Sequence, residues 1–424
     1  MRIDEIFSFE KGILQSSKCV PGDFDFITAS SDWKTHNEYT HDCEALIFAA
    51  AASGSLGRTH YVNGKFVSSD LCFIITPKDQ ANLPVDLKFY HILFNELKDE
   101  IVRNTKAGTS KEAIGLGSFG KYELPYFDID IQIAIKNQFV NSEEIKSSLT
   151  TELNQQVGLV KKLRQQLLQD AVQGKLVEQN KKDEPASELL KKIKAEKEKL
   201  ISEKKLKKEK ELSPIKPEEI PFEIPGNWVW CRLGEICDTR LGKMLDGTKN
   251  KGELYPYFRN LNVQWYRFEL DDVLLMKFEA TELEEYSVKK GDLLICEGGY
   301  PGRGAIWESE DETFKFQKAL HRVRFYNKIP ARLYLFYLDL ICTNGRIEDY
   351  LTGSGIQHLT GISLKKMPIP LPPLAEQNRI VQKLDELMQY CNELEARIKQ
   401  SESHNEKLLQ QVLREALRKE TVEA

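Results

Sequence analysis

Two long stretches of the chain repeat mainly apolar residues alternately every four and every three positions. In the second stretch these positions are Ile380, Leu384, Leu387, Cys391, Leu394, Ile398, Ser401, Asn405, Leu408 and Val412. The first stretch, from Ile135 to Leu167, keeps the same register, with the polar Ser142 and Lys146 in its early part. A sustained spacing of about 3.5 residues is typical of a coiled-coil seam rather than of a broad amphipathic face. We therefore predict two long helices that pair with each other, over the alternative that each helix lies on its own domain.

The segment before the second predicted helix cannot itself be helical. Pro368, Pro370, Pro372 and Pro373 fix the backbone angle φ and lack the N–H groups that a helix needs. The helix can begin only after Pro373, which places Glu376 in its first turn, where a negative charge is favourable. A stiff extended segment that leads into a stiff helix would hold a globular domain at a set position on that helix.

The rest of the chain mixes strand and helix patterns. Short apolar runs typical of buried strands lie at 45–52, 71–77, 292–299 and 321–327, and patterns typical of helices lie at 89–102 and 333–351. We expect the α+β class, with two globular mixed domains and two long helices that form an antiparallel coiled coil. The expected parts are domain 1 at 1–136, the first long helix with a charged extension at 137–213, domain 2 at 214–375, and the second long helix at 376–424.

The sequence contains an internal pseudo-repeat. Shifting it by 245 residues aligns 108–171 with 353–416 without a gap, and 14 of the 64 pairs are identical, Gln132 with Gln377 among them. At the same offset SGSLGRT (53–59) meets GGYPGRG (298–304), and at a shorter offset IDEIFSFEKG (3–12) resembles LGEICDTRLG (233–242). A duplication with so long a period predicts two copies of one unit, each a globular domain followed by a helix.

Composition limits the class of protein. With 424 residues, 41% of them hydrophobic and 29% charged, the chain suits two or three ordinary soluble domains. No run approaches the roughly 18 apolar residues of a membrane span, and the start shows no secretory signal. The eight cysteines include no CxxC pair, which favours reduced thiols in the cytoplasm over a zinc ribbon. A net charge of −5 does not favour a nucleic-acid binder, although local basic patches are compatible with it.

The segment 181–213 is strongly charged, with twelve lysines against eight acidic residues. This pattern predicts an exposed helical extension whose charges face solvent, and contact with DNA or a partner is the less favoured alternative.

Motifs for catalysis are weak. GLGSFG (115–120) matches GxGxxG but neither follows a clear strand nor opens a helix. Asp292 and Glu297 suggest a metal nuclease, yet no lysine stands two residues after Glu297, and the first copy offers only IFAAAA at 47–52. The seven histidines show no ligand spacing, and no P-loop, HExxH motif or nucleophile elbow occurs. We therefore expect no catalytic residue, no metal site and no cofactor.

Several motifs of the second copy together resemble one family. They are IPFEIPGNWVWCRLGEI (220–236), YFRNLNVQ (257–264), GDLLICEGG (291–299), PGRGA (301–305) and GSGIQHLTGISLKKMPIPLPPLAEQNRIVQKL (353–384). They are similar to the DNA-specificity subunit of type I restriction–modification systems. The resemblance covers the whole chain, but it is looser in 1–175, where PLPPLAEQ is replaced by PYFDIDIQ and the aromatic opening is missing.

The resemblance implies a DNA-binding role in a larger enzyme. Each globular domain would be a target-recognition domain for one half of a split site in double-stranded DNA, and the coiled coil would set the spacing. Two methyltransferase subunits would dock on the helices, translocating restriction subunits would join the full complex, and this subunit would catalyse nothing. Because the two domains differ in sequence, the site should be asymmetric. The alternatives are a stand-alone endonuclease or a fragment of a fused methyltransferase, and, less favoured, a structural coiled-coil scaffold.

The residues expected to contact DNA are polar groups in turns. Arg58 and Arg303 lie in glycine-bearing turns after buried strands, where a guanidinium could reach guanine O6 and N7 or form an ordinary ion pair. Lys121 and Lys366 recur at one position before the helices and suit phosphate contacts. The other candidates are Thr109, Ser110, Lys111, Arg240, Lys243, Arg259, Asn260, Asn262, Ser354, Gln357 and His358.

Overall fold

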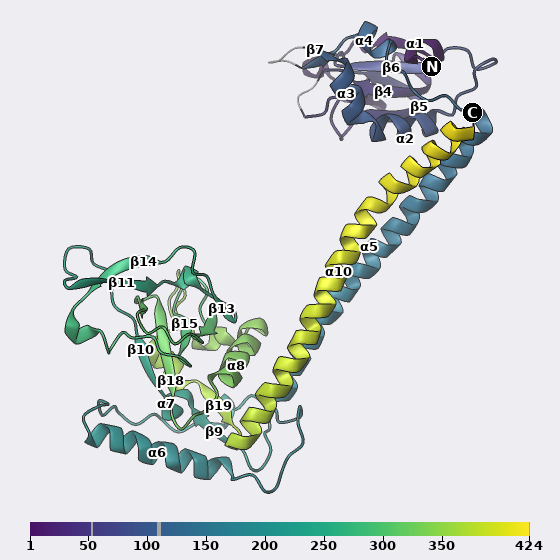
Figure 1. The fold of residues 1–424 in the computed structure, drawn as a ribbon. Helices are drawn as coiled ribbons and strands as arrows, with labels where there is room; N and C mark the ends of the chain where they lie inside the picture. Colours follow the sequence, from purple (N-terminus) through teal and green to yellow (C-terminus); the bar gives the residue numbers. More distant parts are fainter. Residues whose placement is uncertain (52–53, 108–111, 424) are drawn as a thin grey trace. The chain divides into compact units, whose positions relative to one another are not determined.

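The computed structural model describes residues 1–51, 54–107 and 112–423. The chain forms two compact units, one made of Met1–Gln155 with Lys399–Ala424 and the other of Gln156–Ile398. Two long helices, α5 (Ile129–Val172) and α10 (Leu374–Glu423), each contribute one part to either unit. The predicted combination of mixed globular domains with two long helices is confirmed (Figure 1).

The globular part of the first unit is built on a six-stranded sheet. Its strand order is β1 (Phe7–Lys11), β6 (Cys72–Pro77), β4 (His41–Ala49), β5 (Thr59–Ser68), β2 (Phe24–Ile27) and β3 (Lys34–His36). Successive residues of β4 belong to two different clusters, because Leu46 and Phe48 face one apolar core while Ala45 and Ile47 face another. The helices α2 (Leu87–Glu96) and α3 (Lys98–Thr105) contribute apolar side chains to the first of these cores.

The globular part of the second unit contains a four-stranded antiparallel sheet. Its order is β10 (Cys237–Leu241), β18 (Leu320–Phe325), β15 (Leu293–Cys296) and β16 (Gly304–Ile306). A second sheet has the order β14 (Leu274–Phe278), β11 (Glu253–Phe258) and β17 (Lys315–Phe316). Helix α8 (Ala331–Thr343) belongs to a core that continues into the helix pair through Leu168, Ile380 and Leu384.

The two globular parts share one framework, as the repeat predicts. The order β1-β6-β4-β5 corresponds to β10-β18-β15-β16, and the short helices α1 (Ile3–Ile6) and α7 (Leu233–Ile236) precede β1 and β10. Gly12 and Gly242 follow these strands, and their backbone N–H groups donate to the carbonyls of Cys72 and Leu320, each at 3.0 Å. A Cβ on Gly12 or Gly242 would lie within 2.2 Å of a carbonyl oxygen of the crossing segment. The internal duplication therefore extends to single backbone contacts.

The two copies differ in what is added to this framework. In the first unit, β2 and β3 extend the sheet beyond β5. In the second unit, the residues between β10 and β15 form β11, β14 and the hairpin of β12 (Val263–Gln264) and β13 (Arg267–Phe268). The same framework thus carries two unlike surfaces.

The proline-rich segment forms β19 (Pro368–Leu371), which pairs antiparallel with β9 (Val229–Arg232). The Met367 carbonyl accepts a hydrogen bond from Leu233 N–H at 2.9 Å. In an antiparallel pair every second residue bonds to the neighbouring strand, so Met367 and the alternate residues after it direct their backbone groups toward β9. Pro368 and Pro370 occupy the intervening positions, where a missing N–H costs no ladder hydrogen bond. The prolines are therefore compatible with a buried strand that ends directly before α10.

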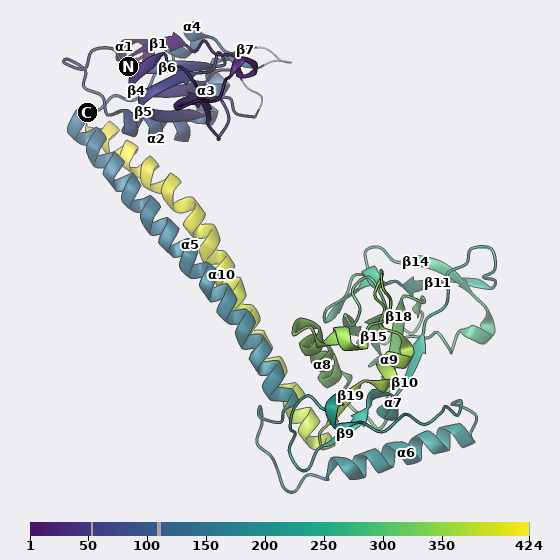
Figure 2. The same cartoon turned by 180° about the vertical axis from the view of Figure 1, so that it is seen from behind.

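The two helices pair in both units (Figures 1 and 2). In the second unit, Arg164 of α5 donates to Asn392 of α10 at 2.7 Å, while α5 residues nearer its end share a core with Ile380 and Leu384, so the pairing is antiparallel. In the first unit, Asn405 donates to the carbonyl of Lys146 at 3.1 Å and to Thr150 Oγ1 at 3.0 Å.

The predicted seam is correct in part. Ile135, Ile380, Leu384, Cys391 and Ile398 are buried, but the predicted seam residues Leu149, Leu163 and Leu394 are exposed. On α5 the partly or fully buried positions after Val160 include Arg164, Leu167 and Leu168, so Arg164 takes the place that the prediction gave to Leu163.

Candidate nucleic-acid interface

Arg303 stands in the turn between β15 and β16, immediately before β16. Its Nη2 donates to the carbonyl of Asn260 at 2.8 Å, and its guanidinium lies 4.5 Å from the centre of the Tyr300 ring. Within the part of the chain that the structure describes, its buried Nε has no hydrogen-bond partner. Arg303 thus joins its own turn to the turn η3 (Asn260–Asn262).

Arg58 occupies the equivalent place in the first unit, immediately before β5. Its Nη1 lies 3.4 Å from the carbonyl oxygen of Ala29 and 3.3 Å from Ser55 Oγ. In both units, the arginine of the turn therefore bonds to the backbone of a separate loop. Neither arginine takes part in an ion pair within the described part of the chain, so the ordinary ion pair considered above is not what holds either one.

A third segment joins the turns of the second unit. Thr352 and His358 pair through their backbones, and Leu359 N–H donates to the Glu297 carbonyl at 2.8 Å. A Cβ added to Gly298 would lie 2.9 Å from His358 Nδ1, so the 352–358 loop lies close against the β15–β16 turn. The predicted residues of this loop, namely Ser354, Gln357 and His358, are all exposed.

A polar groove of about 670 Å³ adjoins these turns. Its walls include Arg240, Glu297, Lys318, His321 and Lys365. Arg240 forms an ion pair with Glu285 and lies 5.9 Å from the ring centre of Tyr286. Lys318 is exposed in the turn before β18. It belongs to none of the motifs described above, so the sequence provided no reason to select it. The groove thus adds cationic groups to the surface that the turns form.

His321 is the buried group of this groove. Its Nε2 lies 2.8 Å from the carbonyl oxygen of Leu359 and therefore donates a hydrogen bond. Burial lowers the pKa of His321, which keeps the imidazole neutral at pH 7. His321 therefore supports the 352–358 segment without adding charge to the groove.

Three predicted contact residues form hydrogen bonds within the domain, and two of them, Lys243 and Asn262, are buried. Lys243 is 8% exposed and donates to the Lys277 carbonyl at 3.1 Å and to the Glu282 carboxylate. Asn262 is 2% exposed and caps η3 by accepting a hydrogen bond from Arg259 N–H at 2.9 Å. Arg259 donates to the Asp272 carboxylate at 2.6 Å. The fold needs these polar groups to close turns, which a linear sequence does not reveal.

The remaining candidates lie elsewhere on the two units. Lys121 and Lys366 are exposed at the ends of the equivalent helices α4 (Leu116–Gly120) and α9 (Gly361–Lys366). Thr109, Ser110 and Lys111 lie outside the described residues. The contacts predicted for all of these residues stay predictions.

The acidic residues considered above for nuclease chemistry have separate places. Asp292 is buried, and both its carboxylate oxygens accept hydrogen bonds from Arg324 at 2.7 Å. Glu297 lies in the groove wall. Across the described ranges, no three His, Cys, Asp or Glu side chains are grouped as metal ligands.

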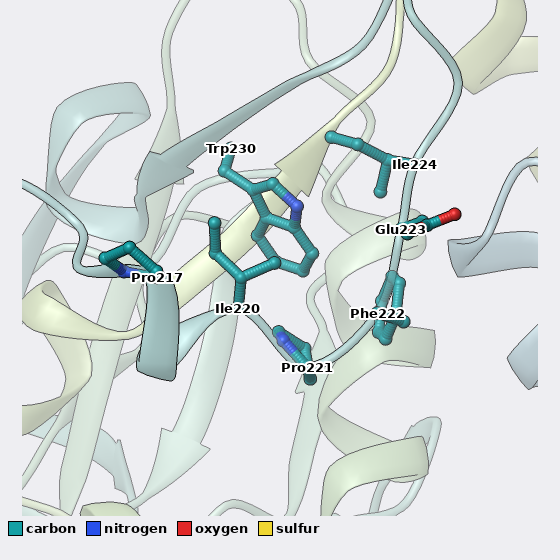
Figure 3. Close-up of a pocket in the computed structure, with 7 residues that line it drawn as sticks. All are labelled: Pro217, Ile220, Pro221, Phe222, Glu223, Ile224 and Trp230. Atoms are coloured by element: carbon teal, nitrogen blue, oxygen red, sulfur yellow. The ribbon is translucent and has the colours of Figure 1, made fainter.

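An apolar pocket of about 490 Å³ lies on another part of the second unit (Figure 3). The segment IPFEIPGNWVW (220–230) lines it: the Trp230 ring sits 5.1 Å from the Phe222 ring, and Ile220, Pro221 and Ile224 surround it. Glu223 is its one titratable lining residue. The motif therefore serves packing beside β9 rather than a polar site.

None of the described helices combines the length and the apolar composition that a membrane crossing requires.

Comparisons with known proteins point in one direction. A protein-family model described as the type I restriction modification DNA specificity domain matches residues 1–159 and 225–401. The type I restriction enzyme EcoAI specificity subunit of Escherichia coli is 34% identical over 269 residues, covering 61% of this chain and 44% of that protein. The EcoEI specificity subunit, also of Escherichia coli, is 29% identical over 250 residues, covering 57% of this chain and 42% of that protein. The matched part of the chain thus spans less than half the length of these two relatives.

Among solved structures, the HsdS subunit from Thermoanaerobacter tengcongensis has a similar fold. It matches 99% of this chain and 96% of its own, at 17% sequence identity and a TM-score of 0.57. At this level of identity the match concerns the fold alone.

Proposed function

The chain belongs to the family of type I restriction–modification DNA specificity proteins, and we propose that it is the DNA-recognition subunit of such a complex. In this proposal it directs methyltransferase and restriction subunits to a bipartite, asymmetric site in double-stranded DNA. Each globular domain reads one half of the site. The domain boundaries proposed for the two readers are those of the sequence analysis, 1–136 and 214–375.

The observation that carries this proposal is one framework with two unlike surfaces. The strand order is the same in both copies, whereas the added strands and the loops at the arginine turns differ. Duplicated readers of identical surface would favour a symmetric site, because the symmetry of a binding protein is mirrored in its DNA site. Two unlike readers favour an asymmetric one.

The long helices are the proposed docking surface for two methyltransferase subunits. Apolar side chains stand exposed on them, Ile145 and Leu149 in the first unit and Leu159, Leu163, Tyr390 and Leu394 in the second. Exposed apolar groups along a rigid helix pair suit association with another protein. Restriction subunits join the complex in the same proposal, which rests on family membership.

We also propose that the subunit itself is not catalytic and acts in the cytoplasm. The purified chain should bind no S-adenosylmethionine and should leave DNA intact in the presence of magnesium. Cleavage by the isolated chain would instead favour the alternative of a stand-alone endonuclease.

Mapping of methylated bases in the genome, with and without this gene, tests the proposed function. A two-part motif with an unspecified spacer should be methylated only when the gene is present together with its methyltransferase partner. Methylation that does not depend on the gene would contradict the proposal.

A further inference from the structure

The equivalent arginines of the two turns already use part of their guanidinium groups for hydrogen bonds within the protein. A two-pronged contact with guanine O6 and N7 needs two free N–H groups on one edge of the guanidinium. In Arg303, Nη2 already donates to Asn260 and Nε is buried. In Arg58, Nη1 is directed at Ala29 and Ser55.

An exposed aromatic side chain lies against Arg303, and another lies in the loop that Arg58 contacts. Tyr300 is 65% exposed in the β15–β16 turn, with the Arg303 guanidinium over its ring. Leu261 and Ile356, on the two segments that meet this turn, are also exposed, at 58% and 75%. The cation over one face of the ring limits the orientations that Tyr300 can adopt.

In the first unit the exposed aromatic residue is Trp33, at 39%. It ends the loop that Arg58 contacts at Ala29, and its Nε1 lies 3.3 Å from Nδ1 of His60. His60 Nε2 lies 2.9 Å from the Ser30 carbonyl oxygen, so Nε2 donates and Nδ1 accepts. Burial lowers the pKa of His60, which favours this neutral form at pH 7. The Trp33 ring is therefore fixed from the adjacent strand β5.

We propose that Tyr300 and Trp33 are specificity-determining contacts to the bases of the two half-sites, and that Arg303 and Arg58 are positioning residues that hold the loops beside them. This inference rests on the proposed function. A ring held rigidly at a surface presents an apolar face to a thymine methyl group, or a stacking face to an unstacked base. The Tyr300 phenol also provides a polar group for the DNA backbone.

The first experiment measures binding of the complete methyltransferase complex to a duplex that carries its mapped site. Tyr300→Ala should weaken binding roughly 5- to 100-fold and relax the preference at positions of one half-site only. Trp33→Ala should do the same at the other half-site, so each variant controls for the fold and assembly of the other. Tyr300→Phe, which keeps the ring, should retain most of the preference. The inference is overturned if both alanine variants keep wild-type affinity and wild-type base preference.

The second experiment separates positioning from direct contact. Arg303→Gln should weaken DNA binding by the wild-type complex. In the Tyr300→Ala background the same substitution should cause little further loss of affinity, because Arg303 acts mainly through the placement of Tyr300. Fully additive effects would show that Arg303 contacts DNA by itself and would overturn its positioning role. Arg267→Gln, at an exposed arginine of β13 paired with Glu269, is the matched control.

The proposed function and the roles of Tyr300 and Trp33 are contradicted by different results. A wild-type complex without any sequence preference would contradict the proposed function and, with it, this inference. If the wild-type complex recognises a clear two-part site, and the Tyr300→Ala and Trp33→Ala complexes keep its affinity and base preference, this inference alone is contradicted.

Discussion

Gln132 and Gln377 are buried at equivalent places, each in the first turn of a long helix. Gln377 Nε2 donates to the Pro372 carbonyl at 2.8 Å, and Gln132 Nε2 donates to the Phe127 carbonyl at 2.7 Å. Each glutamine thus binds the backbone five residues before itself, in the segment that leads into the helix. Their identity in the repeat has a physical cause that is visible only in three dimensions.

Gln377→Ala should therefore lower the free energy of unfolding. The substitution leaves the buried Pro372 carbonyl without its partner, which costs about 1–3 kcal/mol. Urea unfolding of the purified chain measures the loss, and Gln389→Ala, at an exposed glutamine of the same helix, is the control. Equal stability of the two variants would show that the joint does not depend on this hydrogen bond.

His321 predicts a pH dependence of stability. Burial lowers its pKa in the folded state, so on acidification the unfolded chain takes up the proton first, near the ordinary value of about 6.5. The free energy of unfolding should then decrease as the pH falls below about 6.5, and His60 and His91 contribute with the same sign. His321→Gln should make this decrease shallower. A decrease of the same slope in His321→Gln would contradict the assignment.

At the scale of elements, periodicity and proline chemistry were sufficient to predict the long helices, their pairing and the extended segment before α10. The seam was only partly predictable, because Arg164 occupies a position between the helices and bonds to Asn392 and Glu395. A hydrophobicity pattern does not anticipate an arginine there. The burial of Lys243 and Asn262 was not predictable for a similar reason, since polar side chains that close buried turns look like surface residues in a sequence.

The strands added to the shared framework were not predictable from the repeat. They occur where the two copies cannot be aligned, so neither copy informs about the other. A similar lack of correspondence hid Trp33 and Tyr300, because Trp33 lies outside the aligned segments and Tyr300 is aligned with Ser55 rather than with another aromatic residue.

Helix length is predicted to set the spacer of the DNA site. A four-residue insertion near Val157 lengthens α5 by about 6 Å at 1.5 Å per residue. With about 3.4 Å per base pair along DNA, the methylated site should gain one or two spacer bases while both half-sites stay the same. Some loss of affinity is expected, because four extra residues locally unwind a coiled coil. The same insertion in the exposed turn at 246–250 is the control, and an unaltered spacer in an assembled, active α5 variant would contradict the prediction.

At the scale of the whole molecule, the duplication divides binding into two tasks on one framework. Each unit combines a globular domain with parts of α5 and α10, and each has its own apolar core. The framework is shared down to the contacts of Gly12 and Gly242, whereas the surfaces differ. Separate cores allow one surface to change without destabilising the other, which is what independent reading of two half-sites requires.

Exchange of one domain tests this central claim most directly. Residues 1–135 are replaced by the corresponding domain of a relative with a different first surface, and the methylated motif is mapped by sequencing in cells that contain the methyltransferase partner. We predict that one half of the motif changes, while the other half and the spacer length stay as in the wild type. A motif that changes in both halves, or that does not change at all, would contradict independent reading by the two domains.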